Sequence, residues 1–399
     1  MPTLTQLLRG LAPACLLLVP LGAQNASSAL EERFARLEAH LARLEARLGE
    51  TVSADELAPT LKEFSDLERQ LGYDGKTPLV VTRAAGKETR LSVGGYVQAN
   101  AEFGRAPDSR FTGIFNRVLL RRARLTLKGS FAEGFEFTLQ PDFGNNSIAG
   151  VSGYRAQLAD MFLAWTKYDA ANIQVGQFKT PFGYEQLLAD TKVLTTERSL
   201  PNDSLTVSRQ IGVGLSGSFL GKRLAYSVGA FNGNGVNNGA NDNDQFMYAG
   251  RLSAVMLTAP GVRLTSGVNG FWTRDTSTVT TRRTGSGVDT QLTLGPTDWA
   301  VEYLRVLQNR VTGADINGRG WSAQGAWFFV PKTWQALVRY ETYDANTVLP
   351  ANVSTNWVYG LTWCFNGDDL KLTFNYTVGN PAGPLQHEGR ISTRLQVVF

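Results

Sequence analysis

The chain has few of the residues from which catalytic and metal sites are commonly built. Its 399 residues include two histidines, His40 and His387, and two cysteines, Cys15 and Cys364. Two histidines supply too few ligands for a histidine-based metal centre, and because Cys15 lies in a predicted leader, the mature chain keeps one thiol and forms no internal disulfide. The G-x-S-x-G, P-loop, CxxC and HExxH motifs are missing. We therefore expect a protein that is no enzyme and uses no cofactor or metal.

Long apolar runs and clustered charge are also missing. No stretch of ~18 apolar residues follows residue 29, so the sequence offers no transmembrane helix. The net charge of +4 is modest, and the basic residues are scattered, which argues against a nucleic-acid partner. Glycine, in contrast, is abundant at 41 residues, and aromatic residues reach 10%. That composition is typical of many strands joined by glycine-rich turns.

Residues 1–29 have the pattern of a secretory signal peptide. Arg9 provides the positive start, and residues 11–21 form a short apolar core. Cleavage is expected after Ala23, with later alanines as alternatives. A secreted chain that lacks a transmembrane helix can still span a membrane as a closed barrel, because its strands pair their backbone groups with one another.

Residues 30–72 are expected to form a short α-helical coiled-coil segment. The first apolar series has the four-three spacing of a coiled-coil seam and comprises Leu30, Phe34, Leu37, Leu41, Leu44 and Leu48. Gly49 and Gly72 end the two helical stretches. A helical hairpin and a trimeric stalk both remain open, since a helix this short is marginal alone. Residues 73–89 are expected to be a linker.

From residue 90 to residue 399, apolar and polar residues alternate in segments of about ten residues. Period two with one apolar face is expected of a strand with hydrocarbon on one side and water on the other. The region therefore predicts an all-β transmembrane barrel of about 16 antiparallel strands, the tenth of them over residues 286–294. In the last segment, Ile391, Leu395, Val397 and Phe399 share one parity, whereas Ser392, Arg394 and Gln396 share the other.

Short and long connections alternate along this region. Short ones, such as 169–170 and 259–260, are followed by longer polar ones, such as 232–244. Barrels of the bacterial outer membrane have short periplasmic turns and longer outer loops, and Trp and Tyr gather near their strand ends, as they do here. A soluble propeller also has many short strands, but it predicts no such alternation. With an even strand number both chain ends lie in the periplasm, so the helices of residues 30–72 are expected there.

The longest connection, Thr180–Gln210, is predicted to narrow the pore. It joins the fifth and sixth predicted strands and carries apolar residues such as Phe182, Leu194 and Leu205. A barrel of this size has an aqueous lumen. A long loop with apolar content is expected to fold into that lumen rather than to extend into solvent.

Basic residues mark the expected constriction. Arg122, Arg124 and Lys128 have the parity opposite to their apolar neighbours and should face the lumen, because a cation at the bilayer midplane costs ~2–4 kcal/mol. Arg121 has the other parity and needs a bulge, a subunit interface or a strand-end position. Rings of arginine and lysine select for anions and phosphate. The candidate anion-binding, pore-lining residues are Arg121, Arg122, Arg124, Lys128, Lys179, Lys192, Arg198 and Arg209.

Four stretches of sequence resemble the phosphate-selective porins O and P, in the order in which that family has them. They are 121–125 (RRARL), 175–182 (VGQFKTPF), 197–201 (ERSLP) and 209–214 (RQIGVG). The resemblance is good over residues 90–235 and elsewhere rests on pattern. It implies a sixteen-stranded trimeric barrel that takes up phosphate or other anions through a constriction of arginine and lysine. The family often has a second basic residue where Gln210 stands.

Two functions follow from these patterns. The first is an outer-membrane porin for passive diffusion of anions, phosphate or polyphosphate among them, as a homotrimer surrounded by outer-membrane lipid. The second is a general or weakly selective porin with a structural tethering role, in which the periplasmic coiled coil holds peptidoglycan or another partner. Pairing of the basic residues with Glu185, Asp190 and Glu197 would reduce anion preference, and we favour selectivity over such pairing.

Overall fold

The computed structural model describes residues 79–84, 87–131, 134–144, 148, 154–274, 280–380 and 388–399. The predicted signal peptide (1–29) and coiled-coil segment (30–72) lie outside the described residues, as does His387. The chain divides into two units, Met1–Val93 and Gly94–Phe399. No helix among the described residues is long and apolar enough to cross a membrane.

In the first unit, part of the expected linker is a β-hairpin. Strand β1 (Leu79–Ala84) pairs antiparallel with the beginning of β2 (Lys87–Gly104), with Val81 opposite Arg90. The linker expected over residues 73–89 thus contains extended strand at 79–84 and from Lys87, while its role as a linker stays a prediction. The physical reason is the run 79–82 (LVVT), which is rich in β-branched residues that favour extended backbone.

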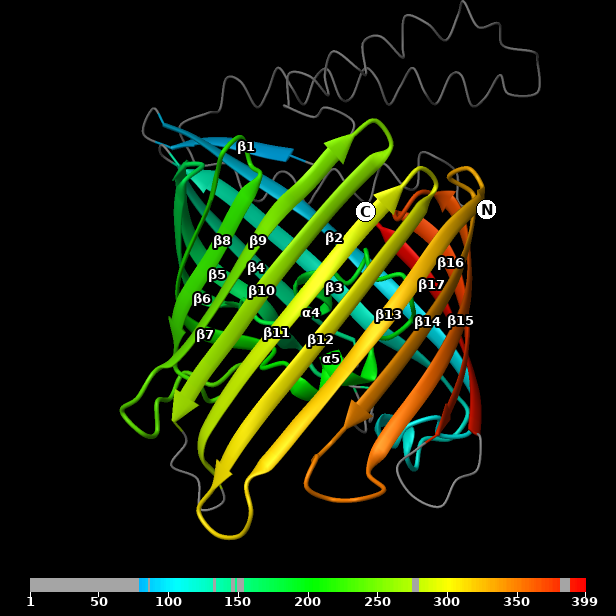
Figure 1. Ribbon diagram of the computed structural model, residues 1–399. Coiled ribbons are helices and arrows are strands. Elements are labelled where there is room, and N and C mark those ends of the chain that lie inside the picture. Colours follow the sequence, from blue (N-terminus) through cyan, green and yellow to red (C-terminus); the bar gives the residue numbers. More distant parts are fainter. Residues whose placement is uncertain are drawn as a thin grey trace, which may run out of the picture. The chain divides into compact units, whose positions relative to one another are not determined.

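The second unit is a closed antiparallel barrel of 16 strands, β2 to β17, with β2 taking part from Gly94 onward (Figure 1). Each strand pairs with its neighbours in the chain, and the last strand closes the barrel on the first, with Thr393 opposite Ala101. The prediction of about 16 antiparallel strands is confirmed. The other strands are β3 (Arg117–Phe131), β4 (Phe135–Asp142), β5 (Gln157–Tyr168), β6 (Ala171–Lys179), β7 (Arg209–Phe219), β8 (Leu224–Phe231), β9 (Met247–Ala259), β10 (Val262–Arg274), β11 (Thr280–Leu294), β12 (Thr297–Arg310), β13 (Ile316–Val330), β14 (Trp334–Asp344), β15 (Val353–Asn366), β16 (Leu370–Asn380) and β17 (Glu388–Val398).

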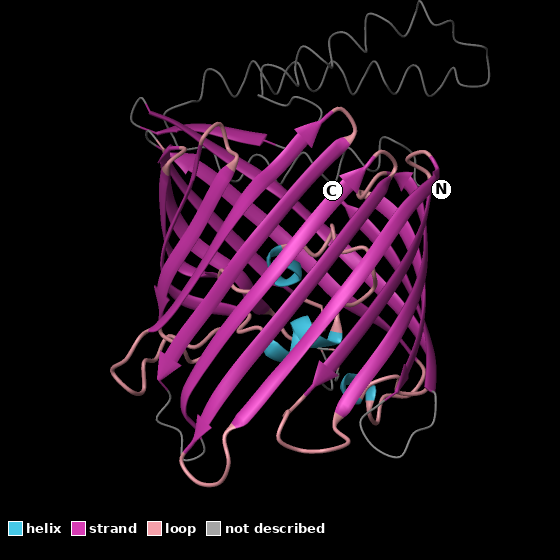
Figure 2. Ribbon diagram, in the orientation of Figure 1, coloured by secondary structure: helices cyan, strands magenta, loops and turns pink. Residues whose placement is uncertain are grey.

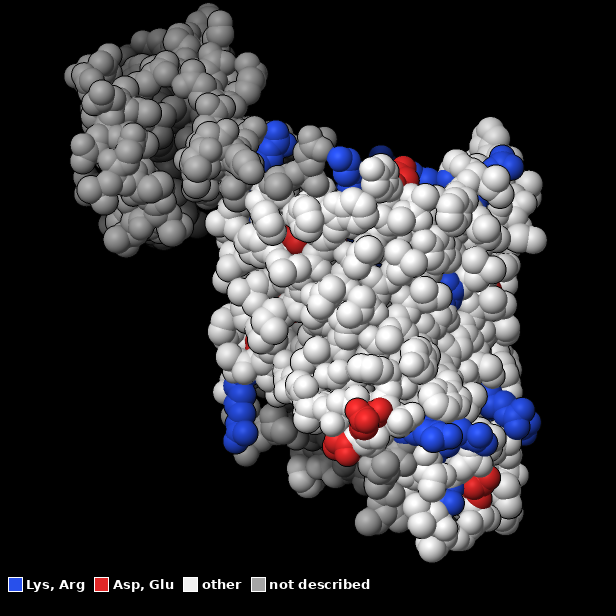
Figure 3. Space-filling view, turned by 90° about the vertical axis from the view of Figure 1, so that its left-hand side faces the viewer, with Lys and Arg blue, Asp and Glu red and all other residues white. Residues whose placement is uncertain are grey.

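The two faces of the wall follow the alternation in the sequence. On β12, Leu304 and Val306 are buried inside the barrel, whereas Trp299 and Val301 are about half exposed on its outer face. Figure 3 shows that the wall between the two ends carries few charged side chains. Because every strand pairs on both sides, the barrel leaves no open sheet edge to water or lipid.

The main difference from the predicted strand boundaries is in β11, which was expected to begin at residue 286 and begins at Thr280. The added residues are polar and carry no apolar alternation, yet they pair with β12, as Arg283 does with Gln308.

The connections at the two ends of the barrel differ in length, as the sequence predicted. The connections β5–β6 and β9–β10 contain two residues each, and we call their end the short-turn end. The β2–β3, β6–β7 and β8–β9 connections lie at the opposite, long-loop end, at the bottom of Figure 1. The β2–β3 connection contains the 3-10 helix η1 (Ser109–Phe111).

Candidate functional site

The β6–β7 connection, Thr180–Ser208, folds into the barrel, and we call it the inner loop. Two short helices, α4 (Tyr184–Leu187) and α5 (Leu200–Leu205), lie within the outline of the barrel in Figure 2. Helix α5 contacts β12, β13 and β14. The loop ends are tied together, because the Thr180 backbone N–H and hydroxyl both donate to the Ser208 carbonyl, at 3.1 and 2.7 Å. The loop therefore crosses the lumen from β6 and β7 to strands on other parts of the wall.

One part of the inner loop is held by apolar packing. Phe182 is fully buried, and its ring meets that of Phe271 edge to face at 4.8 Å between centroids. Leu205 and Val207 join the same cluster from the other end of the loop. Edge-to-face aromatic pairs add to the favourable burial of both rings. The wall contributes Phe178, Phe231, Met247, Ala249, Phe271, Leu304 and Val306 to this cluster.

A different part of the loop is held by charge, and Asp190 is its first anchor. The Asp190 carboxylate accepts from Arg124 Nη1 at 2.5 Å and lies 2.8 Å from Arg198 Nη1. The Tyr96 hydroxyl donates to the same carboxylate at 3.1 Å. Arg124 also donates from Nε to Asp142 at 2.8 Å, so this arginine joins the loop to two neighbouring strands.

Glu197 is the second ionic anchor. Arg121 donates to both of its carboxylate oxygens, from Nε at 2.8 Å and from Nη2 at 2.9 Å. Arg394 of β17 adds a third bond, from Nη2 at 3.1 Å. A bidentate arginine–carboxylate pair fixes orientation as well as distance, so this part of the loop is clamped between β3 and β17.

Arg122 has the weakest charge pairing of the arginines around these carboxylates. Its Nη1 donates to Gln98 at 2.9 Å, and its Nε is 3.7 Å from the Asp190 carboxylate. Within the described residues, that Nε is a buried nitrogen with no hydrogen-bond partner. Leaving a buried charged donor unsatisfied costs free energy.

We call Arg121, Arg122, Arg124, Arg198 and Arg394 the arginine cluster. Its five guanidinium groups contact three carboxylates, those of Asp142, Asp190 and Glu197, which leaves two positive charges in excess. All five arginines are buried between the inner loop and the wall. Charges in such a water-poor setting act more strongly than they would in bulk water.

The arginine cluster also lowers the pKa values of the loop carboxylates that it contacts. Burial alone would raise the pKa of Asp190, but the charges of Arg122, Arg124 and Arg198 outweigh it and hold that pKa well below its ordinary value. Burial acts on Glu197 in the same way, and Arg121 and Arg394 hold its pKa low. Both groups are therefore ionised at neutral pH.

The structure brings four of the eight candidate residues together in the arginine cluster: Arg121, Arg122, Arg124 and Arg198. Arg121 and Arg122 are neighbours, yet both are buried on the lumen side. The inward–outward alternation of β3 therefore changes phase between them, which is the irregularity that Arg121 required. All four stay predictions as anion-binding residues.

Of the other four candidates, Lys179 lies beside the cluster, because its Nζ donates at 2.5 Å to the Leu188 carbonyl that also accepts from Arg198 Nη2 at 3.0 Å. Arg209 pairs with Asp160 at 2.8 Å. Lys192 pairs with Asp368 in the turn between β15 and β16, at 2.7 Å, away from the arginine cluster. Lys128 is exposed and lies opposite Thr138 of β4, near the short-turn end.

Sequence reasoning missed three arginines that hold the inner loop. Arg110 of η1 donates to the Arg198 carbonyl at 2.8 Å and to the Asp203 carboxylate at 3.2 Å. Arg394 stood on the polar parity of the last predicted strand, which was a usable signal. Arg339 of β14 reaches Thr195 at 2.7 Å and the Glu197 carbonyl at 3.2 Å. It lies in a strand that carried no cluster of basic residues, so only the fold shows that it faces the loop.

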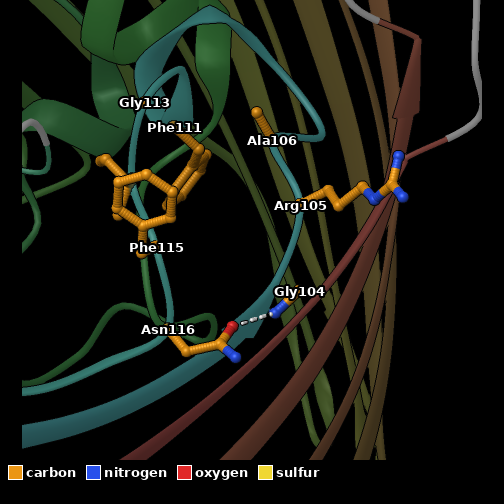
Figure 4. A pocket seen from close by; sticks show the side chains of 8 residues that line it. Gly104, Arg105, Ala106, Phe111, Gly113, Phe115 and Asn116 are labelled. Carbon is orange, nitrogen blue, oxygen red and sulfur yellow. Dashed lines mark hydrogen bonds between the residues drawn. The ribbon is translucent and has the colours of Figure 1, made fainter.

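A separate pocket of about 380 Å³ lies in the β2–β3 connection (Figure 4). In it, the Gly104 backbone N–H donates to the Asn116 side-chain oxygen at 2.9 Å, and none of its lining residues belongs to the arginine cluster. No group of three or more potential metal ligands occurs among the described residues.

A closed 16-stranded barrel with a long loop folded into its lumen defines the porin class of outer-membrane channels. The family model for the phosphate-selective porins O and P matches residues 92–288 and 279–399. The chain belongs to this family, whose members are channel proteins. No match was found among curated protein sequences.

Solved structures show the same fold at low sequence identity. An anion-selective porin from Comamonas acidovorans is 12% identical, with a TM-score of 0.57 over 78% of this chain and 100% of that one. OmpT of Vibrio cholerae in a trimer form is 12% identical, with a TM-score of 0.55 over 78% of this chain and 99% of that one. The outer-membrane channel DcaP of Acinetobacter baumannii is 13% identical, with a TM-score of 0.56 over 80% and 99%.

Proposed function

We propose that this outer-membrane porin passes small anions by passive diffusion and that inorganic phosphate is among them. The observation that carries the proposal is the excess of two positive charges in the arginine cluster, at the point where the inner loop meets the wall. A fixed excess of one sign inside a narrow, low-dielectric passage raises the local concentration of the opposite ion. No bond is made or broken, so the protein acts as a path and not as a catalyst.

The proposed preference is for anions as a class. Arg121 already gives both arms of its guanidinium to Glu197, so the fork that a phosphate would need is occupied. Arg122 has the least complete charge pairing of the five arginines, so its charge contributes most to the field that a passing anion meets. This pairing also favours the second candidate, a weakly selective porin, because paired charges contribute less field than free ones.

Reversal potentials test the proposal. In planar bilayers with a potassium chloride gradient, the wild-type channel should prefer chloride, and Arg122→Ala should lower the anion-to-cation permeability ratio about twofold or more, since it removes one of two excess charges. Arg305→Ala is the matched control, because Arg305 lies on the outer face of β12. A wild-type channel that prefers cations would refute the proposal, and equal effects of both variants would remove Arg122 from it.

We extend the proposal to assembly and orientation. A homotrimer is supported by the likeness to a trimeric relative, and the alternation of connection lengths supports a long-loop end that faces outward.

Three predictions for the N-terminal region rest on the sequence alone: the signal peptide of residues 1–29, the periplasmic coiled coil and a tether to peptidoglycan. Deleting residues 30–72 would test the tether, because a channel without a tethering role should conduct and select as before.

A further inference from the structure

Outside the lumen, arginines stand on the lipid-facing surface near the long-loop end. Arg305 of β12 lies between Leu304 and Val306, which are both buried inside the barrel, so its side chain leaves the wall on the outer face. Arg319 of β13 lies between two buried glycines, and its side chain is 55% exposed. The ion path of the proposed channel uses neither residue. Figure 3 shows basic side chains gathered near this end of the barrel.

The register places these two charges face to face. Arg305 is the direct cross-strand partner of Arg319. Side chains in such positions have Cβ atoms ~4.5–5.5 Å apart, and like charges there destabilise the pair. The two preceding strands repeat the arrangement, with Arg274 of β10 directly opposite Arg282 of β11.

Neighbouring groups compensate the Arg305–Arg319 pair only in part. Arg305 donates from Nε to the neutral side chain of Asn317 at 2.9 Å. The nearest carboxylate to Arg319 is that of Asp344, at 3.6 Å from Nε. The pair of facing guanidinium groups thus has one carboxylate beside it, paired with Arg319, and one positive charge remains on this outer surface.

The height of the pair matches the edge of the apolar band. Phe329 marks the short-turn end of β13 on the outer face, and Arg319 is ten residues away along the same strand. Ten residues span ~33 Å of strand, or ~25 Å along the barrel axis at a tilt of ~40°, which is the height of the apolar band in outer-membrane barrels. Tyr303 and Trp321, opposite one another, occupy the adjacent position on the lipid side. The arginines therefore stand at headgroup level, just beyond an aromatic pair.

We propose that the Arg305–Arg319 pair binds the phosphate of a lipid headgroup in the leaflet at the long-loop end. A phosphate monoester offers several oxygens to two guanidinium forks, and its negative charge between them removes their repulsion. The lipid is the proposed source of the phosphate because both side chains project from the lipid-facing wall beside aromatic rings. The inference rests on the barrel's place in a membrane, and it is independent of the selectivity proposed for the lumen.

Native mass spectrometry of the full chain in a neutral detergent tests this site. Phosphatidic acid is titrated against phosphatidylcholine with the same acyl chains. The wild-type protein should retain phosphatidic acid at least about fivefold more strongly, and Arg319→Glu should abolish that preference. This variant should still fold, because the pairing of the new carboxylate with Arg305 on β12 offsets its repulsion from Asp344, its cross-strand partner on β14.

Lys222→Glu is the matched control, with the same change of charge in the exposed β7–β8 turn at the short-turn end. It should keep the wild-type preference. The proposal fails if Arg319→Glu retains the preference, if Lys222→Glu loses it equally, or if inorganic phosphate alone displaces the lipid at the concentration at which the lipid binds. Reversal potentials of Arg319→Glu should equal those of the wild type. The lipid-binding result can therefore be interpreted even if the channel does not select anions.

Discussion

The inner loop is held in the lumen by two unlike anchors. Phe182, Leu205 and Val207 hold one part of it through an apolar cluster that contains no ionisable group. Asp190 and Glu197 hold the other part through buried ion pairs with the arginine cluster. Both anchors are buried, but they differ in what burial costs, because apolar burial is favourable in itself and ion burial must be offset by exact pairing.

Because of that difference, one anchor determines the position of the loop and the other determines the ion selectivity of the channel. The apolar anchor fixes where the loop crosses the lumen and adds no field. The ionic anchor adds a net positive field, although most of its arginine charges are paired with the carboxylates that hold the loop. A porin with only the first anchor would be narrow and unselective, so the excess of guanidinium over carboxylate groups is the part that bears on selectivity.

The largest expected effect comes from breaking the apolar anchor. Phe182→Ala removes a fully buried ring from a packed cluster and should cost ~3–5 kcal/mol of stability. Thermal unfolding in detergent should show the loss, and bilayer recordings should show larger and noisier conductance as the loop loosens. Phe182→Leu is the control and should cost less, because it keeps most of the apolar volume. Equal conductance noise in all three proteins would mean that the ionic anchor alone holds the loop.

Acid should release the ionic anchor and spare the apolar one. The folded-state pKa values of Asp190 and Glu197 lie below their ordinary values of 3.8 and 4.5. A carboxylate of this kind contributes its stability in full above its unfolded pKa and loses it as the pH falls through the folded pKa. The contribution of these two carboxylates to loop-dependent conductance should therefore stay constant from neutral pH to about pH 5 and fall only below about pH 4. Glu302 of β12 is a separate buried carboxylate that accepts from Asn202 of the loop at 2.9 Å, so the test is made in a Glu302→Gln background. A transition between about pH 5 and 7 in that background would contradict the pairing seen here.

The barrel and the inward loop could be predicted because their causes are local. Alternation of period two records which side of each residue meets hydrocarbon, and the apolar content of Thr180–Ser208 records that the loop is buried. Turn composition separates the two ends. The polar start of β11 was missed because its residues carry no such alternation, although they pair with β12.

The ion pairs could not be predicted because their causes are distant in the sequence. Arg124 and Asp190 are 66 residues apart, and Arg121 and Glu197 are 76 apart. The phase change between Arg121 and Arg122 is also invisible to a parity rule, since the rule assumes unbroken alternation. Basic residues thus indicated the right region, whereas which arginine keeps an excess charge depends on the path of the loop.

The smallest expected effect is at Lys192, which sequence reasoning grouped with the constriction. Its side chain is 61% exposed and pairs with Asp368, which also accepts from Lys371 at 2.7 Å. An exposed pair of this kind contributes at most ~1 kcal/mol, so Lys192→Ala should leave thermal unfolding almost unchanged. Anion preference should also stay at the wild-type level, because the charge removed lies at the short-turn end and not in the arginine cluster. A loss of preference as large as that expected for Arg122→Ala would show that the field at the channel's short-turn mouth selects ions, and the two-anchor account of selectivity would then be wrong.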